Sequence, residues 1–426
     1  KGDISERFGY YPDGKLRYAI GGGMRYDYTY DCMGRLTGKS AGGRALLSYT
    51  YDPDGNRTGL TDATGKRTEY TYDYADRLME VRDNGKRQAR YTYNPDGTIS
   101  TLEIGDCGGE GVLYTEYSYD RDKNLTSLKT LIRQGAMGGA YGRLTDNHYS
   151  YDMAGNCIMK QTPAGETRYR YDSLYRLTEA VYPQGRREQF TYDRAGNRLT
   201  RTTQDIREEY SHDTAGRLTK RSVYEMLKDT EIPNTAQKVA EPKTYHYEYD
   251  RQGNTLSDGE NTYRYDSLNR IVEVQTKNGD IQKNRYDGEG LRAELEENGR
   301  LVAFIFDGDK VVSEKTDNNT IRYIRGYELI SSDSEKAKTY YHYASDELGS
   351  TTHLTDENGN VYNYYEYDAF GNFLTKAENV PNRFCFTGEQ YDPVSQLYYL
   401  RARFYSPAIA RFIQEDTYYG DGLNLY

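Results

Sequence analysis

The sequence predicts an all-β protein in which antiparallel β-hairpins repeat along the chain and form a large sheet that curls around an interior. Three observations lead there. Tyr supplies 48 of 426 residues while Trp is absent. A Tyr-Asp dipeptide followed by Gly and then Asn or Arg and Leu recurs along the chain, as at Tyr30–Leu36 and Tyr192–Leu199. Successive copies are mostly about 20 residues apart, the period of a repeat architecture.

Composition excludes several other classes. Mean hydropathy is −0.98, and Leu, Ile, Val and Phe are scarce, which is typical of disordered chains. Disorder also requires high net charge and few aromatic residues, whereas net charge is −10 and aromatics make up 14%. We therefore expect an ordered protein with a core rich in phenol rings, and not a helix bundle or a doubly wound enzyme.

Each repeat contains its own turn signal. Asp52–Gly55 places Asp, Pro and Gly at the first, second and fourth positions, the order that a type I turn favours. A Gly after such a turn also suits a bulged hairpin. Lys123 and Tyr175 stand where other copies have Gly, so we expect those two turns to be altered.

Between the turns the pattern has period two. In Arg67–Tyr72, Thr68, Tyr70 and Tyr72 fall on one face. A second turn lies mid-repeat, at Thr64–Lys66. One repeat is thus about two strands of ~7 residues, and we expect the hairpins to form one long antiparallel sheet, which must twist and curl.

Longer steps between copies indicate insertions. They include Gly135–Gly139 and the polar stretch Glu225–Pro242, which we expect to be surface loops. The tyrosine stripe is interpreted as structural packing between hairpins, with binding of sugars or bases by exposed rings as the alternative.

Other chemistry is sparse. The acidic balance argues against a nucleic-acid partner. No apolar run is long enough to span a membrane. We also expect no cofactor and no bound metal. His212 and His246 are interpreted as substitutes for repeat tyrosines, and Asp307–Asp309 as a hairpin turn instead of a calcium loop. The four cysteines show no metal-ligand spacing and are expected to be unlinked thiols; they are Cys32, Cys107, Cys157 and Cys385.

These copies resemble the YD repeats of Rhs proteins, of the B and C components of insecticidal toxin complexes, and of teneurins. The resemblance covers roughly residues 8–426. Its C-terminal part is similar to the Rhs-associated core, through an ordered series of motifs at Tyr341–Ser350, Phe386–Glu389, Tyr398–Pro407, Ala410–Asp416 and Gly422–Tyr426. It implies YD repeats over residues 1–335 and a core domain over residues 336–426.

The resemblance also implies a function. In that family a β-strip spirals into a hollow shell, the core plugs one end, and a variable C-terminal segment, often a toxin, lies inside. The resemblance implies that this chain forms such a spiralling, hollow shell, or an arc of it. In many members the core is an aspartyl autoprotease, whose machinery here resembles Arg403 and Asp416. The second catalytic Asp is expected beyond Tyr426, so cleavage is not expected from this chain alone. Asp416 could instead be a turn or cap residue, and Arg411 is expected to order the plug.

The sequence therefore predicts a monomeric, secreted or surface-exposed bacterial shell that houses and delivers its own C-terminal toxin, released by autoproteolysis. We expect the chain to be part of a longer protein. One alternative is a teneurin-like adhesion or carbohydrate-binding module that contacts cell-surface glycans. Another is a decayed repeat fragment without activity.

Overall fold

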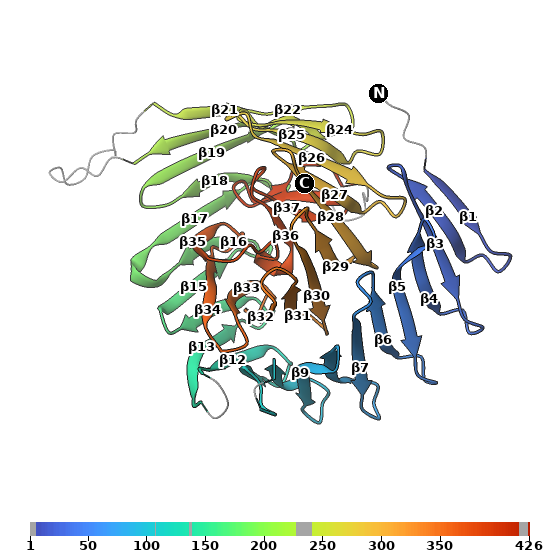
Figure 1. Ribbon diagram of the computed structural model, residues 1–426. Helices are drawn as coiled ribbons and strands as arrows, with labels where there is room; N and C mark the ends of the chain where they lie inside the picture. The colour runs from blue at the N-terminus through green and yellow to red at the C-terminus, as the bar shows by residue number, and fades with distance from the viewer. Residues whose placement is uncertain (1–5, 107, 136–138, 227–240, 417–424) are drawn as a thin grey trace.

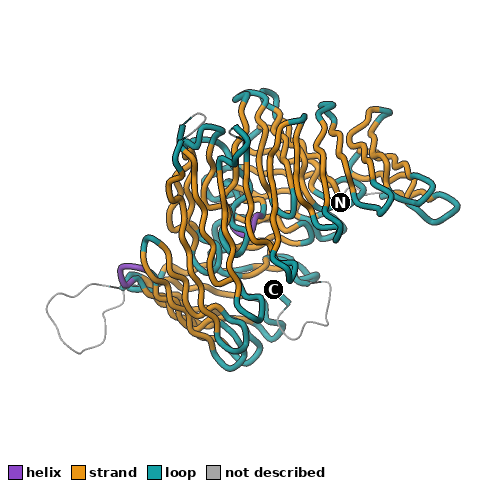
Figure 2. The backbone as a smooth tube through the Cα atoms, turned by 90° about the horizontal axis from the view of Figure 1, so that it is seen from below, coloured by secondary structure: helices purple, strands orange, loops and turns teal. Residues whose placement is uncertain are grey.

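The computed structural model describes residues 6–106, 108–135, 139–226, 241–416 and 425–426. These residues form antiparallel sheets of 21, 14 and 4 strands, with two 3-10 turns, η1 (Pro183–Gly185) and η2 (Phe386–Gly388). Figures 1 and 2 show that the long sheets curve around the centre of the molecule. The predicted all-β spiral is confirmed. Within these residues, the structure has no helix that is long and apolar enough to cross a bilayer.

The strands follow the chain, and within each sheet every strand pairs with the next. The first sheet contains β1 (Arg7–Tyr10), β2 (Leu16–Gly21), β3 (Met24–Tyr30), β4 (Leu36–Ala41), β5 (Arg44–Tyr51), β6 (Arg57–Asp62), β7 (Arg67–Tyr72), β8 (Leu78–Asp83), β9 (Lys86–Tyr93), β10 (Ile99–Ile104), β11 (Leu113–Tyr119), β12 (Leu125–Arg133), β13 (Tyr141–Tyr151), β14 (Cys157–Thr162), β15 (Gly165–Tyr171), β16 (Leu177–Val181), β17 (Arg187–Tyr192), β18 (Arg198–Thr202), β19 (Ile206–His212), β20 (Leu218–Glu225) and β21 (Lys243–His246). The second contains β22 (Glu248–Tyr249), β23 (Thr255–Ser257), β24 (Thr262–Tyr265), β25 (Ile271–Gln275), β26 (Ile281–Tyr286), β27 (Arg292–Glu297), β28 (Arg300–Asp307), β29 (Lys310–Lys315), β30 (Thr320–Arg325), β31 (Leu329–Ser334), β32 (Thr339–Ser345), β33 (Thr351–Thr355), β34 (Val361–Tyr367) and β35 (Phe373–Glu378). The third contains β36 (Gln390–Asp392), β37 (Leu397–Leu400), β38 (Arg403–Ser406) and β39 (Arg411–Phe412).

The repeat aspartate closes each turn with its side chain. Asp31 Oδ1 accepts hydrogen bonds from the backbone N–H groups of Met33 and Arg35, both at 2.9 Å. Its Oδ2 accepts from Arg35 Nε at 2.7 Å. These bonds, led by the one from the Arg35 backbone, hold the pKa of Asp31 below its usual value. The sequence Asp-x-x-Gly-Arg is thus a complete turn unit.

The expectation that Lys123 and Tyr175 would alter their turns is wrong. Both adopt the left-handed conformation, with φ of 66° and 61°, and both donate their N–H to the repeat aspartate carbonyl, as Gly does elsewhere. A non-glycine residue in this region costs on the order of 1 kcal/mol. The paired strands on either side and the aspartate bonds fix the register. The turn therefore keeps its shape, and Lys123 and Tyr175 are held in a strained backbone conformation.

The repeat tyrosine ties each hairpin to its neighbour. The Tyr72 hydroxyl donates to the Arg57 carbonyl at 2.9 Å, and the Tyr192 hydroxyl to the Leu177 carbonyl at 2.7 Å. In both cases the acceptor is the first residue of the strand that follows the preceding Tyr-Asp turn. The ring packs while its hydroxyl satisfies a carbonyl, which supports the structural interpretation of the stripe.

The expectation of a single long sheet is corrected at Tyr247. Strand β21 pairs with β20 on one side, and β22 pairs with β23 on the other. Only Tyr247 separates β21 from β22, and its N–H still bonds the Thr219 carbonyl at 3.1 Å. The wall therefore bends here without a connecting loop. The expected loops at 136–138 and 227–240 lie outside the described residues.

The two long sheets are successive turns of one spiral. Strands β26–β31 (gold to brown in Figure 1) lie inside β1–β9. The Tyr28 hydroxyl meets Glu289 at 2.6 Å and that of Tyr49 meets Asp307 at 2.9 Å. One hydrophobic cluster contains residues of both turns, including Val81 and Ile324. The inner face of the outer turn thus packs against the outer face of the inner turn.

The small third sheet fills the centre of the spiral (red in Figure 1). It packs through Tyr399 and Phe404 into the core of the second sheet, and a fully buried ion pair joins Arg292 to Asp392. Strands β31 and β32, on either side of the predicted boundary at 335/336, belong to one ladder. The two-domain division remains a prediction.

Candidate functional site

The candidate residues at the C-terminal end are positioned by the third sheet. Arg403 begins β38, and β38 pairs with β39. Beyond β39, the Ile413 N–H bonds the Phe404 carbonyl at 3.0 Å, and the Phe404 N–H bonds Gln414 Oε1 at 2.9 Å. These bonds keep the chain antiparallel to β38, so Asp416 returns to the start of that strand.

Arg403 and Asp416 form an ion pair. Arg403 Nη2 lies 2.6 Å from Asp416 Oδ2, and the side chains are 21% and 24% exposed. The guanidinium lies over the Phe412 ring, 3.7 Å from its centroid, which favours a cation. The structure thus brings together both residues of the predicted site and leaves the carboxylate reachable.

The end of the chain passes beside this pair. The Asp416 N–H donates to the Leu425 carbonyl at 2.8 Å, and Arg403 Nη1 lies 3.4 Å from the same oxygen. The Tyr426 hydroxyl donates to the Gly253 carbonyl at 3.0 Å. The Leu425 peptide is therefore held next to the Asp416 backbone and the Arg403 guanidinium.

Gly253 makes room for this arrangement. A Cβ there would lie 2.2 Å from Glu415 Oε2 and 2.6 Å from the Tyr426 hydroxyl, and φ is +81°. The close contacts leave no room for a Cβ, and the positive φ favours glycine. Arg411 also packs against Tyr426. Its Nη2 donates to the Gly216 carbonyl at 2.8 Å, and its guanidinium lies 5.0 Å from the Tyr426 ring centroid.

The chemistry open to this site depends on its carboxyl group. Hydrolysis by a carboxylate pair needs two carboxyl groups that share a proton, so that one acts as base and the other as acid. Asp416 is one carboxyl group, and the guanidinium of Arg403 lies beside it. No group of three or more His, Cys, Asp and Glu side chains among the described residues could hold a metal ion.

The remaining sequence candidates are structural. Asp307 ends β28, accepts from the Tyr49 hydroxyl and pairs with Arg57, so the 307–309 segment is a turn between strands. His212 follows a bulge, as the repeat tyrosines do, and burial next to Arg411 lowers its pKa to about 4. Within the described part of the chain, the cysteine thiols are free; they are Cys32, Cys157 and Cys385.

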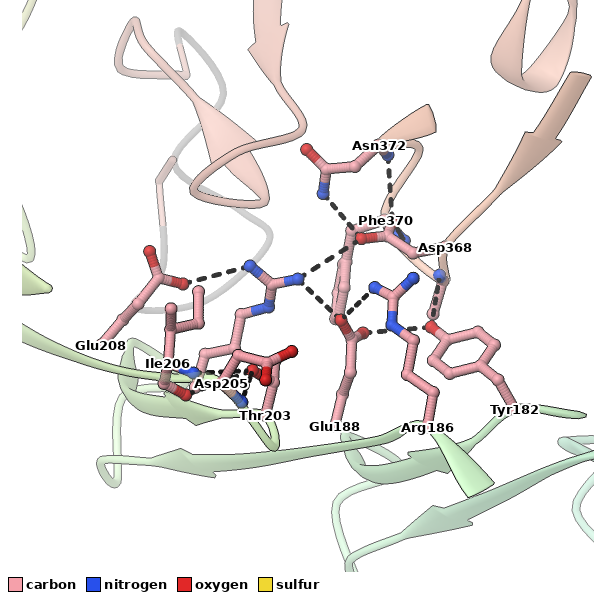
Figure 3. A network of polar contacts seen from close by, with 12 residues as sticks. Tyr182, Arg186, Glu188, Thr203, Asp205, Ile206, Glu208, Asp368, Phe370 and Asn372 are labelled. Carbon is pink, nitrogen blue, oxygen red and sulfur yellow. Dashed lines mark hydrogen bonds and ion pairs between the residues drawn. The ribbon is translucent and has the colours of Figure 1, made fainter. Parts of the chain in front are cut away.

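Sequence reasoning missed the polar contacts between spiral turns. Arg201 on β18 lies 2.6 Å from Glu188, 3.2 Å from Glu208, and 3.7 Å from Asp368, which belongs to a turn of the second sheet. Figure 3 shows Asp368 facing the strands that carry Glu188 and Glu208. The repeat register could have located these residues on the inner face, but only the curvature shows which of them meet.

Comparisons with known proteins agree with this geometry. A family model described as the teneurin YD-shell matches residues 160–424, and one described as the RHS repeat matches residues 51–88. The crystal structure of TcdB2-TccC3-Cdc42 superposes with a TM-score of 0.72 at 18% identity, over 99% of this chain and 24% of that one. That likeness concerns the fold.

Two curated relatives are similar in sequence. The tRNA3(Ser)-specific nuclease WapA of Bacillus spizizenii is 27% identical over 330 residues, which is 75% of this chain and 13% of the relative. The double-stranded DNA deaminase toxin A of Burkholderia cenocepacia is 26% identical over 318 residues, 68% of this chain and 22% of the relative. The chain spans less than a quarter of either relative. Since the shell model matches more than half of the chain, the protein belongs to the teneurin YD-shell family.

Proposed function

We propose that this chain is the wall and inner plug of a bacterial Rhs-type shell that encloses a toxin segment of its own polypeptide. The observation that carries the proposal is the spiral itself: two turns of sheet surround the third sheet, which lies next to residues 425–426. A chain leaving Tyr426 starts beside the inner plug. Such a segment is shielded until it is released.

The sequence relatives support a carrier role. Both are named for a nucleic-acid-directed activity, yet the part shared with this chain is a small share of each. The present chain has a net charge of −10, which disfavours contact with nucleic acid. We infer that the shared part is the shell and that the toxic activity belongs to other segments.

We further propose that Asp416 is one of two carboxyl groups that cut the chain beyond residue 426. The Asp416 backbone N–H and the Arg403 guanidinium both contact the Leu425 carbonyl, so residues that follow Tyr426 would start close to the Asp416 carboxyl group. Arg403 would stabilise the oxyanion or hold a carboxylate.

The test uses the longer protein that contains this chain and the residues after it. Wild-type protein is expected to give a product that ends shortly after residue 426 in intact-mass analysis. Asp416→Asn is expected to abolish the cut, whereas Asp54→Asn, in an exposed turn, leaves it unchanged. Normal processing of Asp416→Asn would refute the protease assignment without affecting the enclosure proposal, which protection of the downstream segment from added protease tests separately.

The family model favours one second candidate, since it is named for teneurins. In that case the shell is an extracellular adhesion or glycan-binding module. Specific hits on a glycan array, together with a downstream segment that is not toxic on expression, would favour it. Under either proposal the protein acts outside the cytoplasm and is a monomer. Light scattering of the purified protein checks the monomeric state.

A further inference from the structure

Two neighbouring cavities lie where the second turn of the spiral meets the first. One, of about 220 Å³, is enclosed by β9–β12 on one side and by residues 327–330 and 343–347 on the other. The second, of about 330 Å³, shares Tyr327–Leu329 and Glu347 with it. The short connection between β30 and β31 therefore lies in the wall of both chambers.

This connection departs from the usual repeat turn. Where other copies have the Asp-closed turn, the chain has Gly326-Tyr327-Glu328, closed by a bond from the Gly326 N–H to the Glu328 carbonyl at 3.0 Å. Tyr327 is fixed to the outer turn. Its hydroxyl accepts from the Leu78 N–H at 3.0 Å, and its ring packs edge-on against Tyr91 with centroids 5.4 Å apart. Glu328 is thereby held at the mouth of both chambers.

Glu328 has no compensating charge. Among the described residues no Lys, Arg or His forms an ion pair with it, and the residue is exposed. Glu328 lines the smaller chamber together with three tyrosines; they are Tyr91, Tyr117 and Tyr119. The carboxyl group and these phenol rings thus belong to the wall of one cavity.

The other acidic groups in this wall are already paired. Lys160 Nζ lies 2.8 Å from Glu347 and 3.9 Å from Asp346. Burial and the charge of Glu347 raise the pKa of Asp346 to about 6. In the smaller chamber, three carboxyl groups therefore stand against one ammonium group, and Glu328 is the one without an ion pair. The cations Lys310, Arg325 and Arg401 line the larger chamber and not the smaller one.

A carboxylate and several aromatic rings that line one cavity can bind an organic cation, because the negative charge and the ring quadrupole both attract it. The smaller chamber has room for the end of an alkyl chain and not for a large ligand. Apolar side chains such as Leu102 and Leu128 complete it and would contact the methylene groups of a lysine-like or arginine-like ligand.

We propose that this chamber is a binding site for an alkylammonium or alkylguanidinium group, with Glu328 as its counter-ion and the tyrosine rings as its walls. Such a group could come from a free amine or from a Lys or Arg side chain of a segment enclosed by the shell. Only the second source rests on the proposed function.

The test is saturation-transfer difference NMR on the purified chain, with n-butylammonium and agmatine as probes and 1-butanol as the neutral counterpart. The cations are expected to bind with a dissociation constant on the order of 1 mM and the alcohol not to bind. Glu328→Gln is expected to weaken cation binding about tenfold or more. Glu335→Gln, an exposed residue of the next turn, is the matched control, and circular dichroism checks that both variants fold.

Equal signals from butanol and butylammonium, or unchanged binding by Glu328→Gln, would overturn the proposal. Tyr117→Leu provides a second variant, since it removes a ring and keeps the charge; it should weaken binding, whereas Tyr117→Phe should not. A repeat with the longer protein separates the two sources. Loss of probe binding there assigns the site to a side chain of the downstream segment, and retained binding assigns it to a free amine.

Discussion

Arg322 is expected to be the strongest single polar link between the two turns of the spiral. It lies on β30 in the inner turn and is 5% exposed. Its Nη1 and Nη2 atoms contact the two carboxylate oxygens of Asp83 in the outer turn at 2.7 and 2.8 Å. It also pairs with Asp62 of the outer turn, and with Asp333 at 3.0 Å.

Replacement of Arg322 by Met keeps the packing of the side chain but removes the charge. Asp83 is fully buried and would keep only bonds from the Tyr340 and Thr68 hydroxyls, while Lys66 would still pair with Asp333. Removal of one partner from a buried ion pair costs about 3–5 kcal/mol, because the other charge remains desolvated. We therefore expect the free energy of unfolding to fall by about that amount.

The assay is urea unfolding followed by circular dichroism. Arg264→Met is the control, since the Arg264 side chain is 72% exposed and pairs with Glu273 on the surface; it should change stability by less than about 1 kcal/mol. Adding Asp83→Asn to Arg322→Met should recover part of the loss. If Arg322→Met is no worse than Arg264→Met, the pairs between turns do not hold the spiral closed.

Three further outcomes follow from single groups. Tyr192→Phe removes the hydroxyl that bonds the Leu177 carbonyl and should lower the free energy of unfolding by about 1 kcal/mol in urea titrations; no loss would contradict the structural role of the repeat tyrosine. Gly253→Ala should destabilise by about 2 kcal/mol or more and expose Tyr426 to carboxypeptidase, since the Cβ would displace that residue, whereas Gly279→Ala, at similar φ but with nothing within 4 Å, should show only the strain of about 1 kcal/mol. Burial lowers the pKa of His342 to about 3, below the unfolded value of about 6.5, so protonation of the unfolded chain should destabilise the wild-type protein as pH falls from 6.5 towards 3. His342→Gln should remove part of that decline between pH 7 and 4.5, and identical pH profiles would refute the assignment.

The repeat made most of the fold predictable. Period, turn residues and alternation are local features, and the bonds made by Asp31 and Tyr72 confirm the turn and the packing that they indicate. The error at Lys123 and Tyr175 has a physical origin: intrinsic turn preference is about 1 kcal/mol, and the strand pairs on both sides outweigh it.

The contacts between turns were not predictable, because they depend on how tightly the sheet curls. Arg322 and Asp83 are 239 positions apart, and no local pattern pairs them. The smaller chamber, which Glu328 lines, could not be predicted for the same reason. The absence of the Asp-closed turn at residues 326–328 was the only local signal for it. Arg403 and Asp416 were singled out through the resemblance of their motifs, and their contact requires the return of the chain after β39.

Single-particle cryo-electron microscopy of the longer protein tests most directly the proposed enclosure, within the wall, of polypeptide that follows Tyr426. We predict a spiral wall that matches the present sheets, with additional density for the downstream segment inside it. A downstream segment that forms a separate domain outside the wall, with an empty interior, would contradict the account.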